Sequence, residues 1–149
     1  MKEEKFMKEA LKEALKALKK DEVPVGCVIV KDNKSVGRGY DKRESTNDPS
    51  AHSEIIAIRK SAKKLGDWRL EDCDLYVTLE PCAMCLGASI LARIRRIIYG
   101  AENPKFGAIS SVINLLDFKW NHKIKIVSGI LKDECSKILK QYFKNKRKK

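Results

Sequence analysis

The sequence has no long apolar run, and its apolar stretches are short pieces such as Val28-Ile29-Val30. A helix that crosses a bilayer needs about 20 consecutive apolar residues, so a membrane-spanning helix is excluded. The first residues, MKEEKFMKEALKEALKALKK, also lack the apolar core of a signal peptide. We therefore expect a protein that is neither exported nor bound to a membrane, and that is cytoplasmic.

Acidic side chains are scarce relative to basic ones. The 149 residues include 20 Asp and Glu against 32 Lys and Arg, a formal net charge of +12. A surface of this charge attracts polyanions, which favours nucleic acid as a partner. A lysine-rich source proteome would produce the same bias with no nucleic acid bound.

The length suits one compact domain, and we predict one domain over residues 1–149 with a basic C-terminal helix and tail from about residue 131.

Cysteine is present in an odd number, five, which does not suit a disulfide framework. In a chain expected to stay in a reducing compartment, cysteines more often bind metal or are buried thiols. Two of them, Cys82 and Cys85, are three residues apart in the stretch LEPCAMCLG. On a helix this spacing places both on one face, where two thiolates can hold one metal ion. Alone, the pair also fits half of a structural zinc site, a redox pair or chance.

Hydrophobic periodicity predicts alternating helices and strands, hence an α/β fold with a partly parallel sheet. The predicted helices comprise the N-terminal segment up to Leu18, residues 52–65 ending at Gly66, 82–93, a short one over 112–116, and a last one with its apolar face at Leu131, Cys135, Ile138, Leu139, Tyr142 and Phe143. The predicted strands comprise a hairpin around Asp32-Asn33, then 74–80, 96–101 and 124–127. Only KNKRKK at the C-terminus is expected to be loose.

The stretch SAHSEIIAIRK supplies a third candidate ligand, His52, and an acid, Glu54. Three protein ligands leave the fourth tetrahedral position to water, as in catalytic zinc sites. Glu54 would then be the general base beside that water. Two helical residues are about 200° apart, so His52 and Glu54 converge only if His52 lies in an irregular entry turn. The alternative for Glu54 is a solvated acid favoured by the helix dipole.

The remaining candidate ligands lack paired spacing and are interpreted as core or surface residues: Cys27, Cys73, Cys135 and His122.

The combination His52-Ser53-Glu54 with Pro81-Cys82-Ala83-Met84-Cys85 is the signature of zinc nucleobase deaminases. Nearly the whole chain resembles bacterial tRNA adenosine deaminases, which convert the wobble adenosine of an anticodon to inosine. The stretches that carry this resemblance are EVPVGCVIV, DPSAHSEIIAI, WRLEDCDLYVTLEPCAMCLGA, RIRRIIYGAENPKFGA and NHKIKIVSGILKDEC.

The resemblance implies a three-layer α/β/α, cytidine-deaminase-like fold with a five-stranded mixed sheet. It implies a zinc-dependent hydrolase with one Zn²⁺ per chain, held by His52, Cys82 and Cys85, and Glu54 as the catalytic acid and base. It also implies a homodimer that binds a tRNA anticodon stem-loop with the target base flipped into the pocket. The substrate-binding residues implied in this way are Pro24, Val25, Asp41, Pro81, Asn103, Asn121, Phe143, Lys144 and Arg147.

Two positions depart from the family pattern. The position of Asp41 usually holds Asn, and the position of Asn103 usually holds Asp, so this chain carries the two exchanged. The exchange bears on contacts to base and ribose and leaves the zinc chemistry untouched. A solvated tail that contacts nothing is the alternative for Lys144 and Arg147.

Two rival functions remain open. A small-molecule guanine or cytosine deaminase would share the zinc motif but would not need the +12 surface. A non-catalytic, zinc-stabilised RNA-binding protein would tolerate Glu54→Gln, whereas an enzyme would lose turnover.

Overall fold

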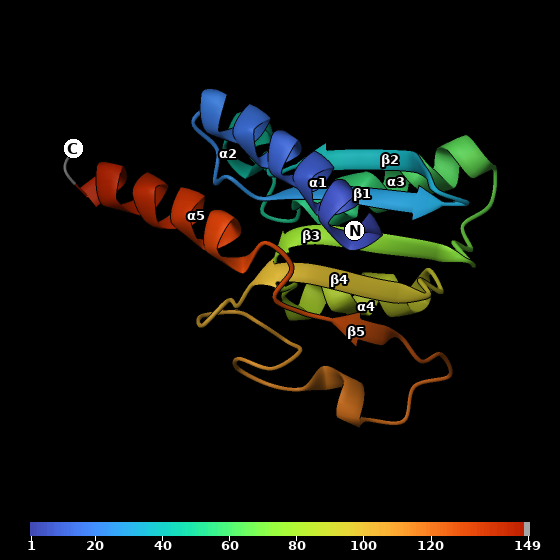
Figure 1. Ribbon diagram of the computed structural model, residues 1–149. Helices are drawn as coiled ribbons and strands as arrows, with labels where there is room; N and C mark the ends of the chain where they lie inside the picture. The colour runs from blue at the N-terminus through green and yellow to red at the C-terminus, as the bar shows by residue number, and fades with distance from the viewer. Residues whose placement is uncertain (148–149) are drawn as a thin grey trace.

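Residues 1–147 are described by the structure, a computed structural model, and they form five strands in one sheet with helices around it (Figure 1). The elements in chain order are α1 (Lys2–Lys19), β1 (Gly26–Lys31), β2 (Lys34–Tyr40), α2 (Arg43–Thr46), α3 (Ser53–Leu65), β3 (Cys73–Leu79), α4 (Ala83–Leu91), β4 (Arg96–Ala101), η1 (Leu115–Asp117), β5 (Lys125–Val127) and α5 (Lys132–Arg147). The predicted alternation of helix and strand is confirmed.

The sheet is mixed, as predicted, with strand order β2-β1-β3-β4-β5. β1 pairs antiparallel with β2 and β3, whereas β3, β4 and β5 run parallel. The β1–β2 hairpin turns at Asp32 and Asn33, which both have positive φ angles, 50° and 62°. A two-residue turn with two positive φ angles matches the twist of the strands, and Asn and Asp tolerate that conformation. The hairpin was therefore readable from local sequence.

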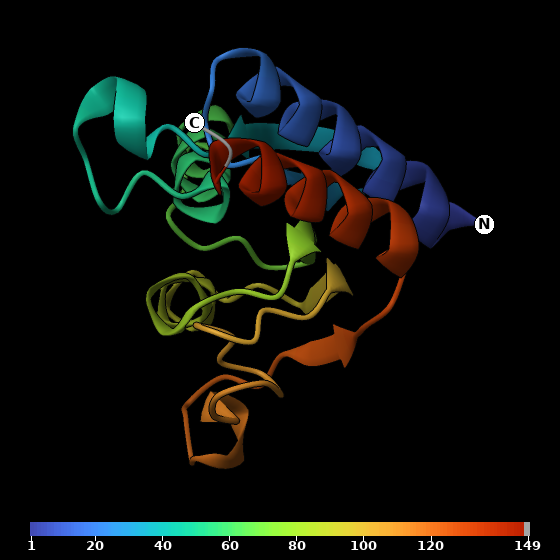
Figure 2. The same ribbon diagram turned by 90° about the vertical axis from the view of Figure 1, so that its left-hand side faces the viewer.

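Helices cover both faces of the sheet, which confirms the three-layer arrangement. Figure 2 shows α1 and α5 on one face and α3 and α4 on the other. One cluster of buried side chains, including Phe6, Met7 and Cys135, fills the α1/α5 side. A second, including Leu75, Leu86 and Ile97, fills the α3/α4 side. β3, the central strand, is buried along nearly its whole length because both faces are covered.

Two local predictions are wrong, and one short helix was missed. The short helix expected over 112–116 is a 3₁₀ turn at Leu115–Asp117, because the Asn114 side chain accepts a hydrogen bond from the Leu116 N–H and starts the turn there. Helix α2 was not predicted; its four residues are too few for periodicity to register. The stretch expected to be loose from Lys144 is helical through Arg147, while Lys148 and Lys149 lie outside the described residues.

The apolar face predicted for the last helix is also partly corrected. Cys135, Leu139 and Tyr142 are buried, but Phe143 is 47% exposed. The helix lies beside α1: the Tyr142 hydroxyl donates to the backbone oxygen of Asp21, and Lys146 pairs with the Asp21 carboxylate at 2.8 Å. This contact turns Phe143 outward. Among residues 1–147, no helix has the length and apolarity required to cross a membrane.

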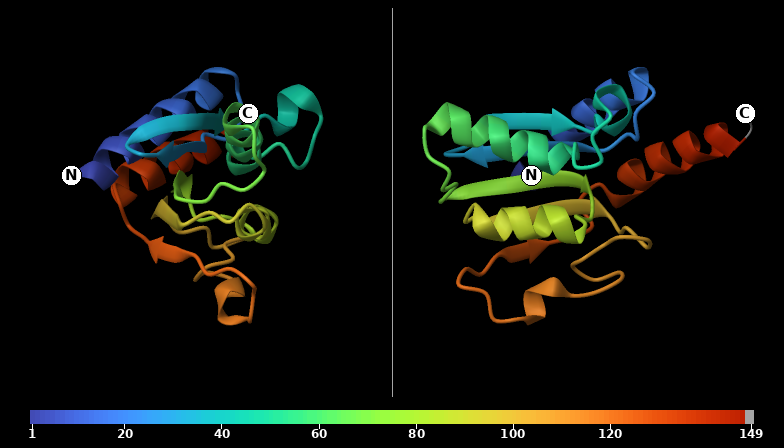
Figure 3. Two further views of the ribbon diagram at one scale, coloured as in Figure 1. Left: turned by 90° about the vertical axis from the view of Figure 1, so that its right-hand side faces the viewer. Right: turned by 180° about the vertical axis from the view of Figure 1, so that it is seen from behind.

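The topology brings three chain segments to one end of the molecule. β3 and β4 are parallel, so their carboxyl ends share one edge of the sheet, with Leu79 paired to Ala101. α4 begins just after β3, and α3 begins at this same end of the molecule, where α5 extends past the sheet (Figure 3). In open α/β sheets the carboxyl ends of the strands are the usual place for a functional site.

A candidate metal centre between two helix starts

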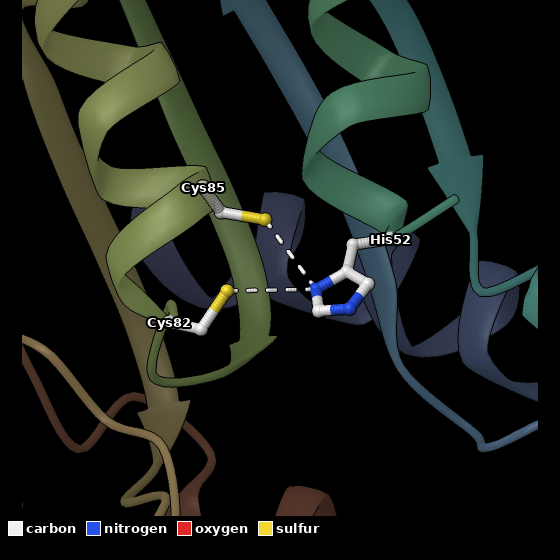
Figure 4. A group of neighbouring side chains, drawn as sticks. All are labelled: His52, Cys82 and Cys85. Carbon is white, nitrogen blue, oxygen red and sulfur yellow. Dashed lines mark hydrogen bonds between the residues drawn. The ribbon is translucent and has the colours of Figure 1, made fainter. Parts of the chain in front are cut away.

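His52, Cys82 and Cys85 converge at this edge (Figure 4). Nδ1 of His52 lies 3.6 Å from Sγ of Cys82 and 3.5 Å from Sγ of Cys85. A tetrahedral zinc ion, with Zn–S about 2.3 Å and Zn–N about 2.05 Å, separates sulfur and nitrogen ligands by about 3.6 Å. The two measured distances match that value, and a His-Cys-Cys donor set suits zinc. The three side chains therefore form a cluster that can hold one metal ion.

Helix ends position these side chains. His52 is the N-cap of α3, with extended backbone angles (φ −78°, ψ 154°), and Cys82 is the N-cap of α4 (φ −75°, ψ 174°). Cys85 lies in the first turn of α4 and is fully buried. The prediction that His52 lies in the entry turn is confirmed. Pro81 precedes this N-cap, since α4 begins at Ala83.

The two thiols differ in acidity. A hydrogen bond from Cys85 lowers the pKa of Cys82 to about 4, opposed by burial and helped by His52. The same Cys82 thiolate, together with burial and the nearby Glu54 carboxylate, raises the pKa of Cys85. The hydrogen bond to Cys82 also raises the pKa of His52. A bound cation would replace the shared protons, because thiolate and neutral imidazole are the ligand forms.

Glu54 is the second residue of α3 and is buried, with 4% of its surface exposed. Its Oε1 accepts a hydrogen bond from the Ser53 hydroxyl at 2.7 Å. Burial is the largest influence on this carboxyl and raises its pKa, against the hydrogen bond from Ser53. The alternative of a solvated first-turn acid is therefore wrong. A buried carboxyl with a raised pKa, next to a candidate metal cluster, is suited to taking up and returning a proton.

The remaining candidate ligands lie elsewhere. Cys27 and Cys73 are buried in the α3/α4-side core and Cys135 in the α1/α5-side core, while His122 Nε2 lies 2.6 Å from the Ile94 backbone oxygen. Their interpretation as core or surface residues is confirmed.

Several predicted substrate-binding residues lie around the same edge. Pro24 and Val25 are buried immediately before β1, and the Asp41 N–H donates to the Val25 backbone oxygen at 3.2 Å. Asp41 itself is buried, and its carboxylate binds the Arg43 side chain and the Arg43 N–H. Asp41 therefore already has a donor partner within the chain. Its contact with substrate stays a prediction.

Asn103 and Asn121 are placed differently from each other. Asn103 follows β4, and its Oδ1 accepts a hydrogen bond from the Phe106 N–H at 3.2 Å. Asn121 precedes His122, whose ring reaches the backbone just beyond the C-terminal end of α4. Cys82 lies at the opposite end of that helix. Within one chain, Asn121 is therefore not brought to the metal cluster.

Sequence reasoning missed two buried carboxylates near this edge. Glu22 accepts hydrogen bonds from the Glu44 and Ser45 N–H groups and so holds α2. Glu80 accepts hydrogen bonds from residues of the 103–111 segment. Burial is the largest influence on both carboxyls and raises the pKa, but these donors outweigh it and hold each pKa below its usual value. For Glu80 the signal in the sequence was an acid at the end of an apolar strand, LYVTLEP.

The sequence matches the MafB19-like deaminase family over residues 1–147. It is 47% identical to the tRNA-specific adenosine deaminase of Streptococcus pyogenes serotype M1, over 97% of this chain and 85% of the relative. The chain belongs to the tRNA-specific adenosine deaminases. Members of this family are hydrolytic enzymes, so the protein is a deaminase.

Solved structures agree with this family assignment. A structure from studies of A-to-I editing by tRNA:A34 deaminases at the wobble position of transfer RNA superposes with a TM-score of 0.87 at 44% identity, covering 90% of this chain and 98% of that one. The guanine deaminase of Bacillus subtilis is less similar, with a TM-score of 0.65 at 34% identity, covering 79% of this chain and 86% of that one. The predicted cytidine-deaminase-like fold is confirmed.

Proposed function

We propose that this deaminase converts the wobble adenosine of a tRNA anticodon to inosine, with one zinc ion per chain. The convergence of His52, Cys82 and Cys85 beside buried Glu54 carries the proposal. The names of the relatives and the wobble-position deaminase of similar structure support the substrate. The family match over residues 1–147 supports one deaminase domain. A tRNA substrate agrees with a cytoplasmic enzyme.

His52, Cys82 and Cys85 would hold the ion. When bound, zinc with three protein ligands lowers the pKa of a water at its fourth position towards 7. The low pKa of Cys82 favours its thiolate form, while Cys85 has to release a proton on binding. Cys85 is buried, which shields its thiolate from solvent, whereas His52 and Cys82 are partly exposed.

Glu54 would move the proton. Its carboxylate accepts a proton from the attacking water and donates it to a ring nitrogen of adenine, while the water oxygen bonds to C6. The second water proton then passes to the C6 amino group, which leaves as ammonia. The hydrogen bond from the Ser53 hydroxyl fixes the orientation of the carboxylate. Because burial favours the protonated form, Glu54 can keep the proton until the base accepts it.

The target base would enter between the segments that surround the cluster. Pro24, Val25, Asp41, Pro81 and Asn103 are proposed to form its walls, since each lies at the end of β1, β2, β3 or β4 on the cluster side. RNA is recognised largely through unstacked bases in loops, and a flipped base reaches the reacting groups.

The end of α5 would contact the anticodon stem-loop. Phe143, Lys144 and Arg147 are exposed on a helix end anchored by Tyr142 and Lys146. This helix end lies at the same end of the molecule as the starts of α3 and α4 (Figure 3). Lysine and arginine neutralise phosphates, and an exposed aromatic ring can stack on a base.

A homodimer is part of this proposal. Exposed apolar side chains lie on α4 and on the segment before β5: Met84, Leu91, Val112, Ile113, Phe118 and Trp120. Exposed apolar side chains of this number mark an interaction surface when they are contiguous. Asn121 directly follows Trp120, so a second copy on this surface could receive it at its own site. Light scattering of wild type and Leu91→Lys tests the dimer, since Leu91 is 70% exposed and its exchange leaves the core intact.

The activity test is incubation of the zinc-loaded protein with an RNA anticodon stem-loop carrying a wobble adenosine, read as inosine. The expected result is inosine at that position and no ammonia from free guanine or cytosine. Ammonia from a free base without inosine would support a small-molecule deaminase instead. Binding without any product would support the non-catalytic RNA-binding alternative.

A further inference from the structure

One buried carboxylate ties a long irregular segment to the metal-binding edge. Residues 102–114, between β4 and η1, contain no helix or strand. Glu80 directly follows β3, is 1% exposed, and its own N–H donates to the Ala101 backbone oxygen at 2.8 Å. It lies two residues before Cys82. Its side chain therefore lies where the end of β3 faces the segment that follows β4.

The Glu80 carboxylate accepts five hydrogen bonds from this segment. Oε1 accepts from the Asn103 N–H at 3.1 Å and from the Ser111 hydroxyl. Oε2 accepts from the N–H groups of Ile109, Ser110 and Ser111 at 3.0, 2.8 and 3.1 Å. The donors are neutral, and they come from both ends of the segment. One side chain thus determines how the segment closes on itself and where it lies on β3.

Gly107 shows how tightly the segment wraps around this carboxylate. A Cβ atom at Gly107 would overlap the carboxyl group of Glu80. The backbone of Gly107 does not have a positive φ, so an alanine is barred by the contact with Glu80 and not by conformation. The Ala108 N–H also donates to the Pro81 backbone oxygen at 2.9 Å. The segment is therefore closely packed on residues next to the metal ligands.

We infer that Glu80 is a positioning residue for substrate: it holds residues 103–111 in the shape that forms one wall of the nucleotide site. The inference rests on the proposed function, because the wall is defined by the base that enters beside the cluster. Glu80 does not take part in metal binding or proton transfer. Its loss should therefore weaken RNA recognition and spare the chemical step.

Glu80→Gln tests this role. In either orientation of the amide, an NH₂ group takes the place of an oxygen that accepts at least two hydrogen bonds, and those bonds are lost. The remaining oxygen is uncharged, and hydrogen bonds to an uncharged acceptor are weaker. We expect KM for the RNA stem-loop to rise about tenfold or more, with kcat within about threefold and one zinc per chain retained. Unchanged KM would overturn the inference, as would a fall in kcat that tracks zinc loss.

Ser111→Ala is the second test variant, used if Glu80→Gln does not fold. It removes one donor from a partly exposed residue, and we expect a smaller rise in KM, about threefold, with kcat and zinc unchanged. A wild-type KM in this variant would overturn the inference in that case.

The same substitution, Gly107→Ala, made in the wild type and in Glu80→Ala distinguishes a positioning role of Glu80 from general destabilisation. Gly107→Ala should raise KM in the wild-type protein but add nothing in Glu80→Ala, where the methyl group occupies the space left by the carboxylate. Gly66→Ala is the matched control: its positive φ of 68° strains an alanine, but it lies at the end of α3 remote from His52, so the substitution should leave KM unchanged. Equal effects of Gly107→Ala in both backgrounds would overturn the inference. Absence of inosine from the wild type would instead overturn the proposed function, and this inference with it.

Discussion

The Nδ1 atom of His52 lies 3.6 Å from the Sγ atom of Cys82, and 30 residues separate the two in sequence. Each residue is the N-cap of a different helix, α3 or α4. The partial positive charge of a helix N-terminus favours thiolate, so the pairing places a metal ligand where its charged form is stabilised. The cluster is therefore a product of where two helices begin.

The first prediction concerns metal content. Purified protein should bind about one zinc ion per chain, and His52→Ala, Cys82→Ala or Cys85→Ala should each abolish it, because three ligands leave no redundancy. Elemental analysis provides the measurement. Cys135→Ala, in the core on the opposite face of the sheet, is the control and should retain zinc. A fully metallated Cys85→Ala protein would refute the site.

The second prediction separates binding from chemistry. Glu54→Gln should retain zinc, fold and RNA affinity but lose roughly 10²–10⁴-fold in turnover, because a neutral amide accepts no proton from water. The amide fits the same volume and can still accept the hydrogen bond from Ser53. Single-turnover rates at saturating RNA give the answer. A loss of less than about tenfold would mean that another group transfers the proton.

The third prediction concerns the end of α5. Deleting residues 144–149 should weaken RNA binding and flatten its salt dependence, by about 0.7 in slope for each phosphate that the shortened protein no longer neutralises. Binding is measured across a series of salt concentrations. The control variant, Lys60→Ala/Lys63→Ala/Lys64→Ala, removes exposed cations from the end of α3 remote from His52 and should change the slope less. Equal slopes for wild type and truncation would indicate a solvated helix end.

The fourth prediction concerns discrimination between RNA and DNA. The resemblance places a carboxylate at position 103 and implies that it accepts a hydrogen bond from a ribose hydroxyl, the group that DNA lacks. Asn103 carries no charge, and its Oδ1 already accepts from the Phe106 N–H. An uncharged acceptor forms a weaker bond, about 1 kcal/mol against roughly 1.5–3 kcal/mol for a charged one.

Asn103→Asp should therefore raise the ratio of kcat/KM on RNA to kcat/KM on a matched DNA stem-loop. The backbone N–H of residue 103 still donates to Glu80 in both proteins, so the segment keeps its position. An unchanged ratio would show that the side chain at 103 does not contact the ribose, and that the exchange is neutral.

Local sequence determined much of this protein. The Asp32-Asn33 turn, the left-handed Gly66 at the end of α3 (φ 68°) and the helical faces each depend on residues a few positions apart, which periodicity and turn chemistry describe. The angular spacing of His52 and Glu54 showed that the two could converge only with His52 in the entry turn of the helix. These features were readable because the forces behind them act within one turn or one hairpin.

Only the tertiary structure decided the rest. The hydrogen-bond donors to Glu80 are 23 to 31 residues away in sequence, and those to Glu22 are 22 and 23 residues away. Asn121 lies at the far end of α4 from Cys82, and Phe143 is turned outward because α5 packs beside the end of α1. A buried carboxylate must find donors wherever the chain brings them, and strand order sets which segments meet. Local sequence patterns do not predict which distant segments come into contact, so only the packed fold shows these contacts.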